Sequence, residues 1–213
     1  MKVVIIDYGL CNLLSVHNAL RSFGVDSTVT PDPEKLKGAD ALILPGVGAF
    51  EDGMKGLRDR GFIRPIEEYV ASGRPLLGIC LGMQLLFDKS FEFGEFEGLH
   101  LIPGEVVPVK PAGSTGVPCK IPHVGWNALL KSTRDWRGTI LGDIPAGAEM
   151  YFVHSYQGVP EYKEHVLAET DYCGNRFCSV VACGNVFGCQ FHPEKSAADG
   201  LTILRSFLSI KGV

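Results

Sequence analysis

The stretch Pro75-Leu-Leu-Gly-Ile-Cys-Leu-Gly-Met-Gln84 predicts a buried strand that turns directly into a helix. Its first half is an apolar run, and residues 83–87 have the character of the start of a helix. Gly78, Cys80 and Gly82 form the cysteine version of a nucleophile elbow, in which the glycines permit a sharp turn. The Cys80 thiol would then project from the top of the sheet, close to a helix N-terminus that favours a thiolate. Taken alone, the motif is equally compatible with a structural thiol buried in a tight turn.

Apolar strands and amphipathic helices alternate through the first half of the chain. Strands are expected at residues 2–7, 25–30, 39–44 and 75–80, and helices at 13–23, 51–60, 62–72 and 83–87. This alternation predicts parallel βαβ units in an open, doubly wound α/β sheet with flanking helices, of the flavodoxin-like kind. Because ligands bind beyond the carboxyl ends of such strands, the loops after Asp7, Leu44 and Ile79 should share one edge.

The second half has short strand patterns separated by turn signals, which predict an additional antiparallel region. The expected strands are 105–109, 118–121, 150–153, 165–170, 177–182 and 186–191, with a hairpin turn at Gly184-Asn185. Residues 110–119 have the composition of a flexible insertion, and no role is evident for Cys119 within it. Asn12 and Ser196 are expected to cap the first and last helices.

No linker or repeat divides the chain, so we expect residues 1–213 to form a single domain.

Composition excludes several classes of partner. The net charge is −4, with 20 basic against 24 acidic residues and no basic block, which argues against nucleic acid and membrane surfaces. No apolar run approaches the ~20 residues of a membrane span, and the N-terminal run is too short for a signal peptide. The cysteine spacings match no common zinc pattern, so Cys173, Cys178, Cys183 and Cys189 are interpreted as buried or half-buried thiols. We therefore expect no metal, no cofactor and a cytoplasmic location.

A second reactive motif, His192-Pro193-Glu194, ends the last apolar strand. Proline favours an extended residue before it, and residues two apart in an extended chain point the same way. Glu194 could then accept the Nδ1–H of His192, leaving Nε2 free to deprotonate Cys80. Alone, the motif could equally be a solvated turn, but together with the cysteine elbow it predicts a catalytic triad.

Acyl transfer from an amide also requires hydrogen-bond donors for the developing oxyanion. Leu81, the residue after the nucleophile, supplies one backbone N–H. The loop Gly46-Val47-Gly48 can supply another, because glycines permit close approach and reorientation of peptides. The same loop is a poor candidate for a phosphate site, since no G-x-x-x-x-G-K sequence follows it.

The stretches Leu44–Phe50, Gly78–Gln84 and Gln190–Glu194 together resemble the class I (triad) glutamine amidotransferases. The motifs at 7–12, 122–127 and 151–156 narrow the resemblance to members that supply ammonia for histidine biosynthesis. The resemblance implies that Cys80 attacks the side-chain amide of L-glutamine, with His192 as acid and base and Glu194 as its orienter. It also implies an oxyanion hole at Leu81, Val47 and Gly48, and substrate contacts from Gly46, Gln84 and Glu92.

The resemblance further implies a heterodimer with a (β/α)₈ cyclase subunit, which builds the ammonia into an imidazole ring. Trp126, Tyr151 and Lys195 would lie toward that partner. Core packing is the alternative for Trp126 and Tyr151, as an ordinary helix position is for Gln84. His123 and His154 are expected to be structural, hydrogen-bonded histidines. Two other functions stay open: the glutaminase of another pathway, such as anthranilate or pyridoxal phosphate synthesis, and a non-catalytic module of the same fold.

Overall fold

The computed structural model of the protein describes residues 1–110 and 120–210. Most of the insertion expected at 110–119, including Cys119, lies outside the described residues. The strand expected at 118–121 is not confirmed, since the described residues Lys120 and Ile121 are not part of a strand.

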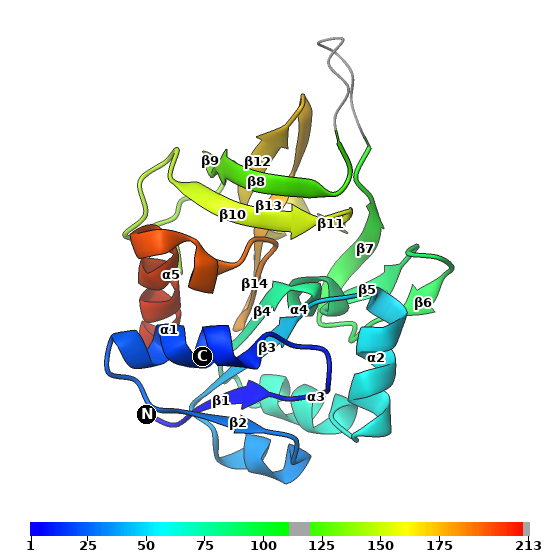
Figure 1. Ribbon diagram of the computed structural model, residues 1–213, viewed down its shortest axis with the longest axis vertical. Coiled ribbons are helices and arrows are strands. Elements are labelled where there is room, and N and C mark those ends of the chain that lie inside the picture. Colours follow the sequence, from blue (N-terminus) through cyan, green and yellow to red (C-terminus); the bar gives the residue numbers. More distant parts are fainter. Residues whose placement is uncertain (111–119, 211–213) are drawn as a thin grey trace.

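An eight-stranded sheet forms the centre of the molecule (Figure 1), with the strand order β2-β1-β3-β4-β14-β13-β12-β9. Its strands are β1 (Val3–Ile6), β2 (Ser27–Thr30), β3 (Ala41–Gly46), β4 (Leu76–Cys80), β9 (Leu130–Lys131), β12 (Val166–Tyr172), β13 (Asn175–Cys183) and β14 (Val186–Cys189). The helices are α1 (Leu13–Ser22), α2 (Phe50–Asp59), α3 (Ile63–Ala71), α4 (Leu81–Leu85) and α5 (Ala197–Ser209), with short 3₁₀ segments η1 (Pro33–Gly38), η2 (Lys163–His165) and η3 (Pro193–Lys195).

Strand pairing in the central sheet changes from parallel to antiparallel at β14, and the antiparallel strands lie in the second half of the chain, as expected. β2, β1, β3, β4 and β14 run parallel, whereas β13, β12 and β9 are antiparallel to their neighbours. The fold is therefore α/β, with a mostly parallel central sheet and an antiparallel region in the second half. Because β14 is the last parallel strand, the segment that follows it emerges beside the end of β4.

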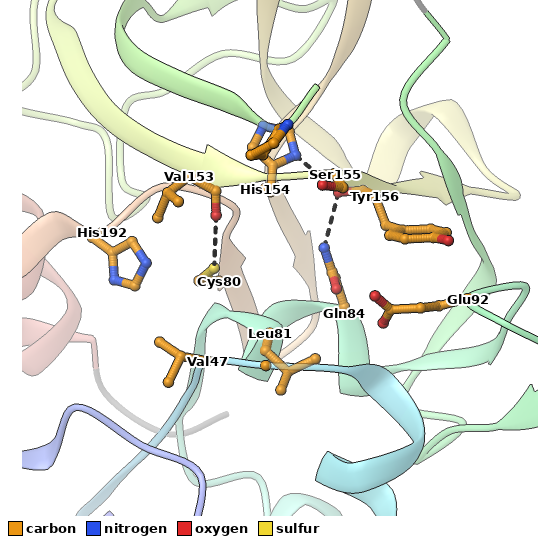
Figure 2. A pocket seen from close by; sticks show the side chains of 12 residues that line it. Val47, Cys80, Leu81, Gln84, Glu92, Val153, His154, Ser155, Tyr156 and His192 are labelled. Carbon is orange, nitrogen blue, oxygen red and sulfur yellow. Dashed lines mark hydrogen bonds between the residues drawn. The ribbon is translucent and has the colours of Figure 1, made fainter. Parts of the chain in front are cut away.

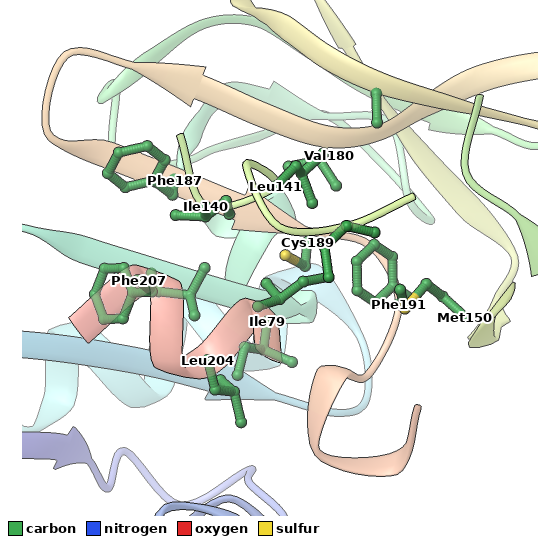
Figure 3. Packing of buried hydrophobic residues seen from close by; sticks show 14 of the residues in the cluster. Ile79, Ile140, Leu141, Met150, Val180, Phe187, Cys189, Phe191, Leu204 and Phe207 are labelled. Carbon is green, nitrogen blue, oxygen red and sulfur yellow. The ribbon is translucent and has the colours of Figure 1, made fainter. Parts of the chain in front are cut away.

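Alternate residues of the parallel strands enter two separate cores. Val3 and Ile5 face α1 and α5, whereas Val4 and Ile6 face α2 and α3. The first core is closed by Ile203, Leu204 and Phe207 of α5 and by residues of the second half of the chain (Figure 3). The Phe187 and Phe207 rings meet there edge to face, with 6.2 Å between their centroids. Burying such a side chain contributes about 1.5–3 kcal/mol, so these contacts hold α5 firmly on the sheet.

Two smaller sheets stand beyond the central one. A ribbon of β8 (His123–Ala128) and β10 (Glu149–His154) is antiparallel, and Met150 and Phe152 anchor it in the α5 core. The second small sheet has the order β11-β7-β5-β6. Its strands are β5 (Phe87–Ser90), β6 (Phe96–Glu97), β7 (Ile102–Pro108) and β11 (Tyr156–Pro160).

The local predictions fail where distant segments provide the hydrogen bonds. The helix expected to run through Phe87 ends at Leu85, because the carbonyls of Leu85, Leu86 and Phe87 accept from the amides of residues 99–102. Asn12 and Ser196 stand at helix N-termini, but neither side chain forms a capping hydrogen bond. The Ser196 hydroxyl instead donates to the His192 carbonyl and accepts from the Tyr151 amide.

Among residues 1–110 and 120–210, no helix has the length and apolar character required to cross a membrane.

Two glycines let α4 lie directly on the strands that precede it. A Cβ on Gly78 would stand 2.6 Å from the Gly82 carbonyl oxygen, and a Cβ on Gly82 would collide with the carbonyl oxygen of Leu44. Since these neighbours are backbone atoms, they cannot move aside as a flexible side chain would.

We therefore expect Gly82→Ala to lower the free energy of unfolding by at least about 2 kcal/mol through overpacking. The sign is opposite to the usual effect of replacing glycine by alanine within a helix, which stabilises by about 1 kcal/mol. Equilibrium unfolding in urea measures the change. Gly38→Ala is the matched control, because its Cβ would meet only the mobile Lys2 ammonium. Equal stability of the two variants would contradict the packing argument.

Candidate active site

A pocket of about 290 Å³ opens where the loops after β3 and β4 lie side by side (Figure 2). The predicted residues that line it are Val47, Gly48, Cys80, Leu81, Gln84, Glu92 and His192. The third predicted loop joins the same edge, since the Leu10 carbonyl accepts from the Val47 amide at 3.0 Å. The shared edge expected from the sheet topology is confirmed.

Cys80 occupies a strained turn between β4 and α4. Its φ of 55° and ψ of −112° are rarely adopted by a residue with a side chain. This conformation aims the thiol into the pocket while leaving the residue only 7% exposed. The sulfur lies 3.8 Å from the Val153 carbonyl oxygen and 4.0 Å from Nε2 of Gln190. A nucleophile elbow, as predicted, is therefore present.

His192 and Glu194 form the predicted pair, with 2.8 Å between Nδ1 and Oε1. The expected reason was wrong in part, because residues 193–195 form a 3₁₀ turn and not an extended segment. Both side chains are almost fully buried, and Nε2 of His192 has no hydrogen-bond partner among the described residues. Figure 2 shows the ring facing Cys80 across the pocket.

Opposing effects act on the pKa of His192. Burial lowers it, because a charged ring is poorly solvated in the interior. The charge of Cys80, together with the hydrogen bond and the charge of Glu194, outweighs burial and raises the pKa to about 10. The geometry thus favours an imidazolium at neutral pH, ready to donate a proton to a leaving group.

The proposed oxyanion donors differ in their present orientation. Leu81 is the first residue of α4, where backbone N–H groups have no partner within the helix. The Val47 N–H instead points away from the pocket, toward Leu10. Gly48 has a φ of 110°, which only glycine adopts without strain. Val47 could donate to an oxyanion only after the peptide between Gly46 and Val47 turns over.

Glutamine and glutamate side chains line the pocket beyond Cys80. The Gln84 amide donates to the Tyr156 carbonyl oxygen at 2.9 Å and to Oε1 of Gln190 at 3.0 Å, which fixes its orientation. Glu92 accepts from the Phe50 amide at 2.7 Å, at the start of α2. Burial raises the pKa of Glu92, partly opposed by this hydrogen bond.

Sequence reasoning assigned no role to Gln190, which is fully buried and bridges Gln84 to the Cys80 sulfur. Its position two residues before His192 on an apolar strand was the available signal. The contribution of Val153 was also missed, because it comes from a backbone carbonyl and has no signature in the side chain.

His123 and His154 form a buried structural pair, as expected. Nδ1 of His123 lies 2.9 Å from Nε2 of His154, and Nε2 of His123 lies 2.7 Å from the Asn127 side-chain oxygen. Burial lowers the pKa of both rings, that of His154 to about 3. His154 lines the pocket but is therefore neutral and a poor base at neutral pH.

The cysteines of the second half are mostly the protected thiols expected from the sequence. Cys178 and Cys189 are buried and Cys183 is half-buried, and burial raises the pKa of each thiol. Cys173 corrects the prediction, because it takes part in a disulfide bond.

The described residues contain no group of three or more histidine, cysteine, aspartate or glutamate side chains able to hold a metal.

The residues expected to face a partner gather beside the pocket. Trp126 is 48% exposed and stands opposite Tyr151 in the β8–β10 ribbon, with 5.9 Å between ring centroids. Lys195 is exposed on η3, and the amide of the nearby His192 donates to the Tyr151 carbonyl. Core packing was the alternative for Trp126 and Tyr151; exposure excludes it for Trp126, whereas Tyr151 is half-buried.

We expect the His192 ring to stay protonated until the pH approaches 10, as followed by NMR of the imidazole nuclei. Glu194→Gln should lower this pKa, because glutamine keeps an acceptor oxygen but removes the negative charge that opposes burial. The pKa of His192 is raised above its ordinary value of 6.5, so the protonated ring stabilises the folded protein. This stabilisation is complete below pH 6.5 and is lost as the pH rises toward 10.

The native protein and Glu194→Gln should therefore differ less in free energy of unfolding as the pH is raised from 6.5 to about 10. His154 is the internal control, since it should remain neutral in both proteins. A His192 ring that loses its proton near pH 6.5 would contradict the assignment.

The chain is similar in sequence and in fold to known proteins. The family model described as glutamine amidotransferase class-I matches residues 4–210. The imidazole glycerol phosphate synthase subunit HisH 1 of Legionella pneumophila (strain Lens) is 50% identical over 98% of this chain and 99% of the relative. The corresponding subunit HisH of Geobacter sulfurreducens is 44% identical over 99% of both chains.

Among solved structures, PurLQS from Thermotoga maritima matches with a TM-score of 0.73 and 21% identity, over 98% of this chain and 97% of that one. This likeness shows a common fold. The match of the family model to nearly the whole sequence, with relatives of such high identity, shows that the chain belongs to the class-I glutamine amidotransferases.

Proposed function

We propose that the chain is the glutaminase subunit of imidazole glycerol phosphate synthase. The observation that carries the proposal is that Cys80 and His192 line one pocket, while Glu194 holds the His192 ring with 2.8 Å between Nδ1 and Oε1. Relatives 50% and 44% identical carry that subunit's name. A non-catalytic module is disfavoured, because it has no need of a buried imidazolium beside a strained cysteine.

The reaction would begin with attack of the Cys80 thiolate on the side-chain amide carbon of L-glutamine. A C–S bond forms, and the oxyanion is held by the Leu81 N–H and by the Val47–Gly48 loop once Val47 turns. The C–N bond then breaks, and Nε2 of the His192 imidazolium protonates the leaving ammonia. Neutral His192 next takes a proton from water, which hydrolyses the thioester to glutamate and restores the thiolate–imidazolium pair. Glu194 would orient the ring throughout.

The layout of the pocket suits a glutamine molecule lying along it. Cys80 and Glu92 stand toward opposite ends, with Gln84 between them (Figure 2). Glu92 would bind the α-amino group, while Gln84 and the backbone of Gly46 would contact the rest of the substrate. The two amide hydrogen bonds of Gln84 support this role, since they orient its carbonyl oxygen as an acceptor.

The ammonia would pass to a (β/α)₈ cyclase subunit (HisF), which forms imidazole glycerol phosphate and AICAR in histidine biosynthesis. We propose that the partner docks on the ribbon face that carries Trp126, Tyr151 and Lys195, in a cytoplasmic heterodimer. The exposure of Trp126 and of Val124, which is on the same strand, supports this, since aromatic side chains are enriched at protein interfaces.

Cys80→Ala should reduce glutamine hydrolysis by about 10⁴-fold or more, because the nucleophile is lost. Cyclase activity supplied with free ammonia at high pH should persist, since that reaction needs only the partner's site. Cys183→Ala, which removes a thiol remote from the pocket lining, is the control and should keep full glutaminase activity. Normal hydrolysis by Cys80→Ala would refute the proposed function.

The isolated chain should be nearly inactive until the cyclase and its nucleotide substrate bind. The Val47 N–H is held by Leu10 at 3.0 Å, and losing one oxyanion donor typically costs about 100- to 1,000-fold in rate. A glutaminase assay with and without the liganded cyclase measures the stimulation. Full turnover by the chain alone would show that the present orientation of Val47 does not limit the reaction.

A further inference from the structure

Tyr8 carries a buried hydroxyl that the proposed reaction does not use. The residue follows β1 and is 1% exposed, yet its hydroxyl has no hydrogen-bond partner of good geometry among the described residues, and the Cys11 sulfur beside it is a weak acceptor. Tyr69, also fully buried, donates its hydroxyl to the Pro75 carbonyl at 3.3 Å. A buried hydroxyl without a partner lowers the stability of a folded protein. We therefore expect the Tyr8 hydroxyl to find a partner in another conformation of the protein.

The hydroxyl lies against the oxyanion loop. A side chain on Gly46 would collide with it, and the same position borders the Gly82 amide at the start of α4. Burial, and then the neighbouring Cys11, raise the pKa of Tyr8 well above its ordinary value, so the phenol stays neutral and keeps its proton. The Cys11 thiol itself donates to the Pro45 carbonyl at 3.3 Å. The Tyr8 hydroxyl is therefore a proton donor that lies beside Gly46.

The planarity of the peptide bond links this donor to Val47. The Gly46 carbonyl and the Val47 N–H belong to one peptide unit and point in opposite directions. When the Val47 N–H leaves Leu10 to face the pocket, the Gly46 carbonyl oxygen swings to the side that the N–H vacates. The Leu10 carbonyl cannot donate to it there, so the turned peptide needs a proton donor on that side.

We propose that Tyr8 is a positioning residue whose hydroxyl donates to the Gly46 carbonyl oxygen in the turned, active peptide. The inference rests on the proposed function and extends it to a residue outside the triad and the substrate pocket. Turning the peptide then exchanges one hydrogen bond, from Val47 to Leu10, for another, from Tyr8 to Gly46. The hydroxyl is unpaired only in the resting conformation.

Tyr8→Phe tests the proposal by removing a single oxygen. The kcat for glutamine hydrolysis should fall about fivefold, the usual contribution of one neutral hydrogen bond, while KM stays within about twofold. The loss should be larger for the isolated chain than for the complex with the liganded cyclase, which already favours the turned peptide. The thermal unfolding midpoint should stay unchanged or rise, because the oxygen has no partner at rest.

Tyr69→Phe is the matched control. It should lower the unfolding midpoint, because its hydroxyl is paired, and should leave kcat unchanged. Wild-type kcat in Tyr8→Phe, with and without the cyclase, would overturn the inference, as would a lowered midpoint or a loss confined to KM. If the native protein hydrolyses no glutamine under either condition, the proposed function itself fails, and the inference fails with it.

Discussion

The close contact between the backbone of α4 and the end of β3 is the constraint on which the site depends. Gly82 leaves no room for a side chain against the Leu44 carbonyl, and Gly78 leaves none against Gly82. This contact brings the first turn of α4 beside the loop after β3, and Cys80 makes the turn between β4 and α4 in a strained conformation. Cys80 and the proposed oxyanion donors are therefore neighbours because of backbone packing, and the apolar cores on both faces of the sheet hold that packing in place.

Burial acts in the same direction on the two histidines of the pocket, and their neighbours decide the outcome. His154 contacts another imidazole and a backbone carbonyl, so burial prevails and the ring is neutral. His192 faces Glu194 and Cys80, whose charges reverse the effect of burial and keep the ring protonated. Two rings that line one pocket therefore differ in charge, because His154 is neutral and His192 is protonated.

Local patterns in the sequence were sufficient for the parallel half of the sheet, the elbow at Cys80 and the pairing of His192 with Glu194. They failed where a partner distant in the chain decides the structure. The amides of residues 99–102 end the helix at Leu85, and Ser196 bonds to His192 and Tyr151 when it was expected to cap α5. Gln190 could not be assigned for the same reason, since its partners are side chains about 110 residues away. Periodicity reports which face of an element is buried, but not which distant atoms meet it.

The β8–β10 ribbon contacts the side chain of Cys80 and the backbone of His192. The Val153 carbonyl meets the Cys80 sulfur, the Tyr151 carbonyl accepts the His192 amide, and the Tyr151 ring packs beside Trp126. The sulfur and the imidazole come from different strands of the central sheet, so this ribbon is a bridge common to them. A displacement of the strand that carries Trp126 would therefore reach the Cys80 sulfur and the His192 backbone through the hydrogen bonds of one two-stranded ribbon.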